Sequence, residues 1–116
     1  MPTYTKATLS AAISGQQIQI TGTSVSNRTT LHTPASNAYD EVWLYATNVA
    51  TGTTLNLTVC WCQTGLASQM TTQIPPIGGR VLIVDGKLIS GTSNTISAFA
   101  TSGNFINIDG FVNRIT

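Results

Sequence analysis

The chain has 116 residues, of which 41% are apolar and only 8% are Asp, Glu, Lys or Arg, and its formal net charge is +1. Soluble domains carry roughly a quarter charged residues, and a net charge near zero favours association. The composition therefore disfavours a free-floating enzyme and indicates a component of an assembly. The few Lys and Arg residues are scattered, which excludes a basic stripe for nucleic acid.

The first 16 residues contain Thr, Ser and Ala without a regular period. They predict an extended N-terminal arm that becomes ordered only against a partner. Residues 17–116 are expected to form one domain, since a chain of this length buries about two thirds of its unfolded surface. Residues 1–15 also lack the continuous apolar stretch of a signal peptide. No run approaches the roughly 20 apolar residues that cross a bilayer, so we expect the chain to be made in, and to stay in, the cytosol of its producing cell.

The first core strand is predicted at residues 17–22, where Ile18 and Ile20 alternate with polar residues and Gly22 ends the run. Residues 23–39 are polar and contain Pro34, which is typical of a long loop or an edge crossing.

The strongest strand is predicted at residues 40–48. Its alternating pattern separates two sets, Val42, Leu44 and Ala46 on one face, and Glu41, Trp43, Tyr45 and Thr47 on the other. A second strand at residues 55–63 places Leu55, Leu57, Val59 and Trp61 on one face. The two strands predict a β-hairpin with Gly52 in its turn.

The C-terminal half predicts further short strands. A strand at residues 69–74 stops at Pro75 and Pro76, because proline does not donate to a ladder. Residues 80–84 are apolar apart from Arg80 and predict a strand buried on both faces. A turn at Asp85 and Gly86 is expected to lead from it into residues 87–89. The last elements predicted are a strand at 95–101, a hairpin turn at 102–104, and a strand at 105–115 in which Gly110 forms a bulge that swaps the inward face.

About eight strands at short spacing predict an all-β fold, a single antiparallel β-sandwich. The spacing leaves both a jelly-roll-like and an immunoglobulin-like topology open.

The sequence contains few residues that could bind a metal or react. Cys60 and Cys62 would share one face of a strand, about 6.6 Å apart, with parallel side chains that disfavour a mutual disulfide. We interpret them as reduced apolar fillers. A zinc site needs four ligands, and only His32 is available to join them, so no metal site and no cofactor are predicted.

No catalytic residues are predicted either. His32, between threonines, is interpreted as a hydrogen-bonded loop residue and not as a base. Asp85 and Asp109 each precede a glycine, which is typical of side chains that cap tight turns. Asp40 and Glu41 are adjacent but point to opposite faces of a strand.

Aromatic residues are the remaining feature. Each sheet of a sandwich turns one face to the core, so either the face with Trp43 and Tyr45 or the face with Trp61 lies outside it. Such a patch is normally an interface, unless loops of the same chain cover it. We take Trp43, Tyr45 and Phe99 as the candidate oligomer interface.

Three strings resemble one family. DEVWLYATN at 40–48, TTLHT at 29–33 and NTISAFATSGNFINIDGFVNRI at 94–115 are similar to small virion proteins of tailed bacteriophages that resemble capsid decoration (cement) proteins. The resemblance starts near Thr29 and includes LTV at 57–59, IPP at 74–76 and VLIVDG at 81–86. The first 28 residues match loosely, and CWC at 60–62 replaces a polar, glycine-containing stretch.

The resemblance implies a β-sandwich that forms a homotrimer on the outer surface of the virion head and bridges major capsid subunits. In that role the N-terminal arm would contact the capsid, with Thr3, Tyr4, Lys6 and Leu9 as candidate contact residues. An alternative from another class is a host-recognition module of a head or tail fibre that binds glycans through exposed aromatics such as Trp43.

Overall fold

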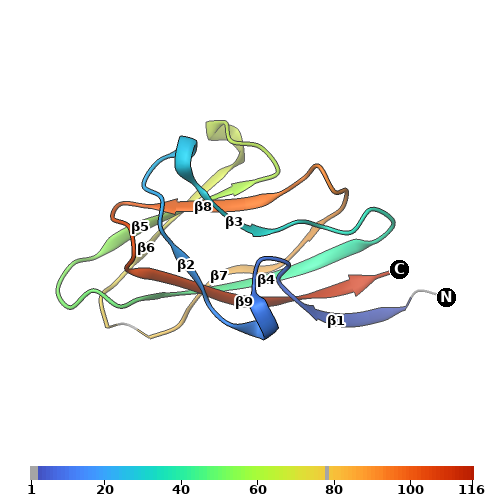
Figure 1. Ribbon diagram of the computed structural model, residues 1–116, viewed down its shortest axis with the longest axis horizontal. Coiled ribbons are helices and arrows are strands. Elements are labelled where there is room, and N and C mark those ends of the chain that lie inside the picture. The colour runs from blue at the N-terminus through green and yellow to red at the C-terminus, as the bar shows by residue number, and fades with distance from the viewer. Residues whose placement is uncertain (1–2, 78) are drawn as a thin grey trace.

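A computed structural model describes residues 3–77 and 79–116, which form strands and three short 3-10 helices (Figure 1). The strands are β1 (Tyr4–Thr8), β2 (Ile18–Ile20), β3 (Thr29–His32), β4 (Tyr39–Asn48), β5 (Leu55–Trp61), β6 (Gln69–Ile74), β7 (Val81–Ile89), β8 (Ile96–Ala100) and β9 (Ile106–Ile115). The 3-10 helices are η1 (Ile13–Gly15), η2 (Val25–Asn27) and η3 (Leu66–Ser68).

The strands form two antiparallel sheets. The larger sheet has the order β1-β9-β4-β7, and β2 also pairs with β9. The smaller sheet has the order β3-β8-β5-β6. The all-β fold class and the antiparallel sandwich predicted from the sequence are therefore confirmed, with nine strands in the described residues instead of about eight.

The core lies between the sheets and follows the predicted alternation. Val42, Leu44 and Ala46 of β4 are fully buried. The facing set on β5, Leu55, Leu57 and Val59, is at most 2% exposed. Trp61 packs against the same core from the end of β5. Each strand thus gives the interior one apolar face, and burying that face stabilises the sandwich.

Two predicted hairpins are wrong. β4 lies in the larger sheet and β5 in the smaller one, so residues 49–54 carry the chain from sheet to sheet. Residues 101–105 make a similar crossing between β8 and β9. Period-2 patterns identify the strands but do not say whether two consecutive apolar faces lie side by side or opposite one another. Here they lie opposite, and each buries the other.

β7 also differs from the prediction. It continues without a turn from Val81 to Ile89 at the edge of the larger sheet, and Leu82 is 46% exposed, so the strand is not buried on both faces. Val42 pairs with Lys87 and Trp43 with Asp85, which makes Gly86 the extra residue of a bulge. Gly86 has φ +81, a conformation that glycine adopts without steric cost.

The predicted bulge at Gly110 is wrong. β9 stays in continuous register with β4, and Gly110 pairs with Leu44. A Cβ at this position would lie 2.0 Å from the carbonyl oxygen of Trp43. The glycine therefore permits a close backbone approach, and the inward face of β9 does not change.

The N-terminal segment is part of the sandwich. β1 pairs with β9 from Tyr4 opposite Ile115 to Thr8 opposite Phe111, and Leu9 is fully buried in the core. The expectation that residues 1–16 order only against a partner is therefore wrong for residues 3–16, and Met1 and Pro2 lie outside the described residues. The predicted loop at 23–39 likewise contains β3, which pairs with β8.

Candidate interaction surface

The outer side of the larger sheet carries a group of aromatic side chains. Alternation places Trp43 and Tyr45 of β4 away from the core, and their partners across the ladder are Phe111 and Asp109 of β9. We call Trp43, Tyr45 and Phe111 the aromatic face. All three are half-buried by their neighbours on the sheet.

Trp43 organises the centre of the aromatic face. Its ring stacks on Phe111 with centroids 6.1 Å apart and an interplanar angle of 11°. Its indole Nε1 donates to Glu41 Oε1 at 2.9 Å, and Asn113 Nδ2 donates to the same oxygen at 3.1 Å. These two hydrogen bonds lower the pKa of Glu41, so the carboxylate stays ionised at neutral pH.

Two cations lie over the other rings. Lys6 Nζ is 4.7 Å from the centroid of Phe111, and the guanidinium carbon of Arg80 is 3.6 Å from that of Tyr45. Arg80 also binds Asp109 at 2.7 Å through Nη2 and 2.8 Å through Nε. With Glu41 included, the face holds two cations and two anions and is electrically balanced.

Exposed apolar residues extend the aromatic face to both sides. Tyr4, Tyr39 and Ile115 align across β1, β4 and β9, and Tyr4 and Tyr39 are more than half exposed. On the other side, Leu82 and Leu88 of β7 are 46% and 53% exposed. A wide apolar and aromatic surface with few free charges is typical of protein interaction sites.

The structure divides the predicted interface residues. Trp43 and Tyr45 lie together on the larger sheet. Phe99 lies on β8 of the smaller sheet, where Ile96, Ala98 and Ala100 fill the core and Phe99 faces outward opposite Thr58. The three residues therefore do not form one patch.

Phe111 was missed by the sequence analysis. The assumed bulge at Gly110 would have reversed the faces of β9 at this point. Without a bulge, the plain alternation of Ile106, Ile108 and Val112 places Phe111 outward beside Trp43.

The predicted arm residues occupy different environments. Thr3 and Tyr4 are exposed, and Thr3 exchanges two backbone hydrogen bonds with Thr116. Lys6 is exposed and belongs to the surface around the aromatic face. Leu9 is a core residue and presents no contact surface.

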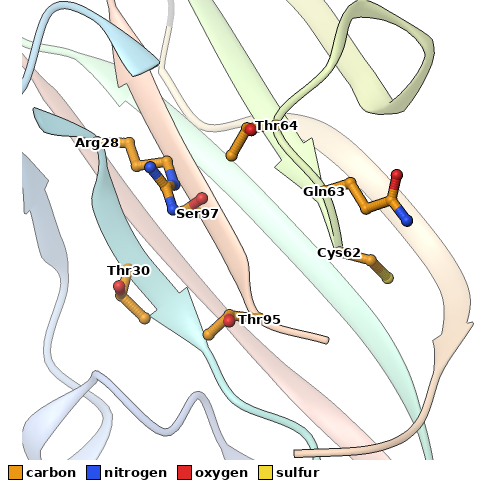
Figure 2. Close-up of a pocket in the computed structure, with 7 residues that line it drawn as sticks. All are labelled: Arg28, Thr30, Cys62, Gln63, Thr64, Thr95 and Ser97. Carbon is orange, nitrogen blue, oxygen red and sulfur yellow. The ribbon is translucent and has the colours of Figure 1, made fainter. Parts of the chain in front are cut away.

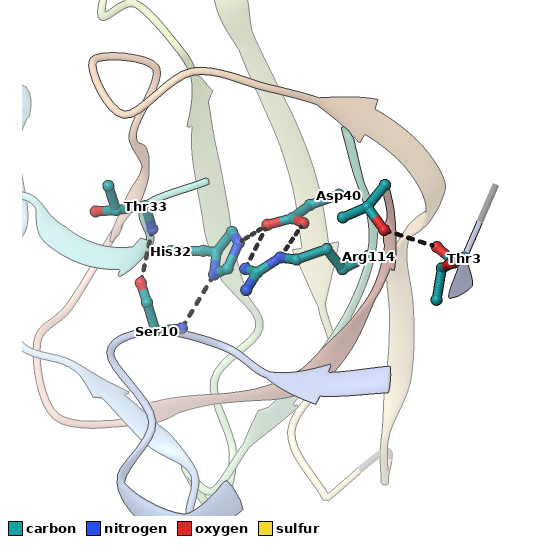
Figure 3. A network of polar contacts seen from close by, with 7 residues as sticks. Thr3, Ser10, His32, Thr33, Asp40 and Arg114 are labelled. Atoms are coloured by element: carbon teal, nitrogen blue, oxygen red, sulfur yellow. Dashed lines mark hydrogen bonds and ion pairs between the residues drawn. The ribbon is translucent and has the colours of Figure 1, made fainter. Parts of the chain in front are cut away.

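A buried polar network between the two sheets links four segments (Figure 3). His32 Nε2 lies 2.7 Å from Asp40 Oδ2, and Arg114 binds both carboxylate oxygens at 2.8 and 3.0 Å. The Ser10 amide donates to His32 Nδ1 at 3.0 Å. Because Nδ1 accepts this hydrogen bond, the proton of the neutral imidazole is on Nε2, which donates a hydrogen bond to Asp40.

The network has a structural role and holds these segments together. Burial raises the pKa of Asp40, but hydrogen bonds from Arg114 and His32 and their charges outweigh it, and the pKa lies below its ordinary value. Ser, His and Asp occur together here, yet the Ser10 hydroxyl accepts from the Thr33 amide at 2.7 Å and contacts the imidazole only through its backbone. A nucleophile needs its hydroxyl within reach of the base. His32 is hydrogen-bonded, as predicted, but lies in β3 and not in a loop.

The cysteines are free thiols. Burial raises the pKa of both Cys60 and Cys62, so both stay protonated at neutral pH. Within residues 3–77 and 79–116, no cluster of three or more His, Cys, Asp or Glu side chains has the arrangement of a metal site.

Comparison of the chain with protein-family models, with curated proteins and with solved structures gave no match. In the part of the chain that the structure describes, no helix is long and apolar enough to traverse a bilayer.

Proposed function

We propose that the chain is a decoration protein of a bacteriophage capsid, which binds the outer surface of the head and bridges major capsid subunits. The observation that carries the proposal is the balanced, aromatic outer face of the larger sheet. This face offers apolar area and four charges that are ion-paired, hydrogen-bonded or held over rings. It suits durable adhesion between proteins and provides no group poised for chemistry.

The resemblance of residues 40–48 and 94–115 to decoration proteins supports the same role. These residues form most of β4 and the segment from β8 to β9, so they include all three residues of the aromatic face. In this proposal the protein is a homotrimer on the outside of the virion. Linked copies raise avidity by about 10² to 10⁴ when all sites bind together.

The aromatic face is the proposed contact between copies. Trp43→Asp places a charge in the centre of this face, and we expect the variant to elute as a monomer in size-exclusion chromatography with light scattering. Phe99→Asp is the matched control, since Phe99 lies on the opposite sheet, and it should keep the assembly of the unmodified chain. A trimeric Trp43→Asp protein would contradict the assignment of this face.

The location on the head has a separate test. Mature heads purified from a producing phage should contain the chain in stoichiometric amount, as measured by quantitative mass spectrometry. Its presence in tails alone, or in lysate alone, would contradict the proposal.

Glycan recognition is the competing function, because a sugar ring could stack on Trp43. It predicts binding of the purified protein to host polysaccharide that Trp43→Ala abolishes. A decoration protein should show no such binding.

A further inference from the structure

A small hollow lies on the outer side of the smaller sheet, where β3, β8 and the end of β5 meet (Figure 2). Its volume is about 50 Å³. The residues around it are Arg28, Thr30, Cys62, Gln63, Thr64, Thr95 and Ser97. All of them are polar or weakly polar, and none is acidic or aromatic. A volume of this size holds one or two water molecules or one small polar group.

Arg28 is electrostatically isolated in this chain. The four side-chain carboxylates belong to Asp40, Glu41, Asp85 and Asp109, and all four lie on strands of the larger sheet. The four strands of the smaller sheet contain no Asp, Glu, Lys or Arg. Arg28 directly precedes β3 and thus brings a full positive charge to a sheet without countercharge.

The guanidinium is held over the hollow. Arg28 Nη1 donates to the carbonyl oxygen of Val25 at 2.8 Å, which fixes the side chain against its own 3-10 helix. Figure 2 shows the guanidinium next to Ser97, whose side chain comes from β8. An arginine has five N–H donors, so most of them stay available for a ligand.

The remaining lining groups suit an anion. Threonine and serine hydroxyls from residues 30, 95 and 97 can each rotate to donate. The thiol of Cys62 is neutral, because burial raises its pKa. Arg28 is therefore the one full charge among the lining residues.

We propose that this hollow is an oxyanion-binding site, in which Arg28 supplies the charge and the hydroxyls of Thr30, Thr95 and Ser97 supply further donors. Its size fits a single carboxylate, phosphate or sulfate group. Arginine binds such groups through paired N–H donors. The site lies on the sheet opposite the aromatic face, and its test does not depend on the proposed capsid function.

The binding test is a titration followed by ¹H–¹⁵N correlation spectra. Sodium sulfate is added to the labelled full chain, and sodium chloride of equal ionic strength is added to a second sample. We expect saturable shifts at the amides of residues 28, 30, 64, 95 and 97 with sulfate and no saturable shifts with chloride. Equal responses to the two salts would overturn the proposal.

Arg28→Gln removes the charge and should weaken sulfate binding about tenfold or more, in line with charged hydrogen bonds of about 1.5–3 kcal/mol. Arg28→Lys keeps the charge without the paired donors and should bind more weakly than arginine and more tightly than glutamine. Arg80→Gln, on the larger sheet, is the matched control and should bind sulfate like the unmodified chain. If Arg28→Gln binds sulfate as well as the unmodified chain, the proposal fails.

Two further titrations identify the source of the group. Sodium acetate represents a carboxylate side chain of a partner protein, and sodium phosphate represents a free inorganic ion. Acetate binding as tight as sulfate binding supports a partner carboxylate, and binding of phosphate and sulfate alone supports an inorganic ligand. If none of the three anions gives saturable shifts, the site does not exist.

Discussion

The two sheets of this sandwich differ sharply in charge. Eight of the nine charged residues lie on the larger sheet or directly beside it, and the ninth, Arg28, borders the smaller sheet. On the larger sheet most of the charges are ion-paired, hydrogen-bonded or held over rings, as with Arg80 between Asp109 and Tyr45. The smaller sheet offers hydroxyls and one isolated cation. Similar strand patterns thus produce an aromatic face on one side and a small polar hollow on the other.

The largest expected effect concerns the buried network of His32, Asp40 and Arg114 between the two sheets. Asp40→Ala leaves Arg114 and His32 without their shared partner, and we expect the free energy of unfolding to fall by about 3 kcal/mol. Arg114 is 33% exposed, so water relieves part of the cost. The measurement is urea denaturation, with the exposed Asp85→Ala as a control that should change stability by less than about 0.5 kcal/mol. Equal effects of the two substitutions would mean that the network contributes nothing.

A second prediction concerns the close approach of β4 and β9. Gly110→Ala adds a methyl group 2.0 Å from the carbonyl oxygen of Trp43, and the backbones must separate. We expect a loss of about 2–3 kcal/mol in urea denaturation. Gly52→Ala, whose added Cβ meets nothing within 4 Å, is the control and should be nearly neutral. A stable Gly110→Ala protein would show that the two strands separate without cost.

A third prediction follows from the pKa of Asp40. This pKa lies below the ordinary value of 3.8 in the folded state. The ionised carboxylate therefore contributes stability that is fully present above about pH 4 and is lost as the pH falls through the folded pKa.

Urea denaturation between pH 7 and pH 2 checks this dependence. The unmodified chain should lose more stability on acidification than Asp40→Ala, which lacks the titrating group. Parallel pH profiles of the two proteins would contradict the role of Asp40.

The smallest expected effect concerns Arg80, which lies over Tyr45 of the aromatic face. Arg80 is half exposed, so its bond to Asp109 and its contact with Tyr45 are screened by solvent. Arg80→Gln should cost less than about 1 kcal/mol in thermal or urea unfolding. A loss comparable to that of Asp40→Ala would show that the contacts of Arg80 with Asp109 and Tyr45 are a major source of stability.

The sequence predicted the strands more reliably than their partners. The alternation in residues 40–48 identifies both the strand and its buried side, because side-chain direction repeats every two residues. Pairing depends on where the connecting loop leads, and neither residues 49–54 nor 101–105 carry a signal that separates a hairpin from a crossing between sheets.

The candidate sites were likewise predictable only where their residues share one strand. Trp43 and Tyr45 were predictable as one patch, since they share a face of a single strand. Phe111 lies beside them only because β9 pairs with β4, and Lys6 only because β1 pairs with β9. Both pairings are long-range. The network of His32, Asp40 and Arg114 likewise joins residues up to 74 positions apart, and a lone histidine between threonines gives no sign of it.

Co-sedimentation with phage heads that lack the protein tests the adhesive role most directly. We expect the chain to bind these heads up to a fixed number of copies, to stay bound in about 0.5 M sodium chloride because few of its charges are free, and to lose binding in Trp43→Asp. A chain that stays in the supernatant at saturating concentration, or whose binding Trp43→Asp leaves unchanged, would contradict the account.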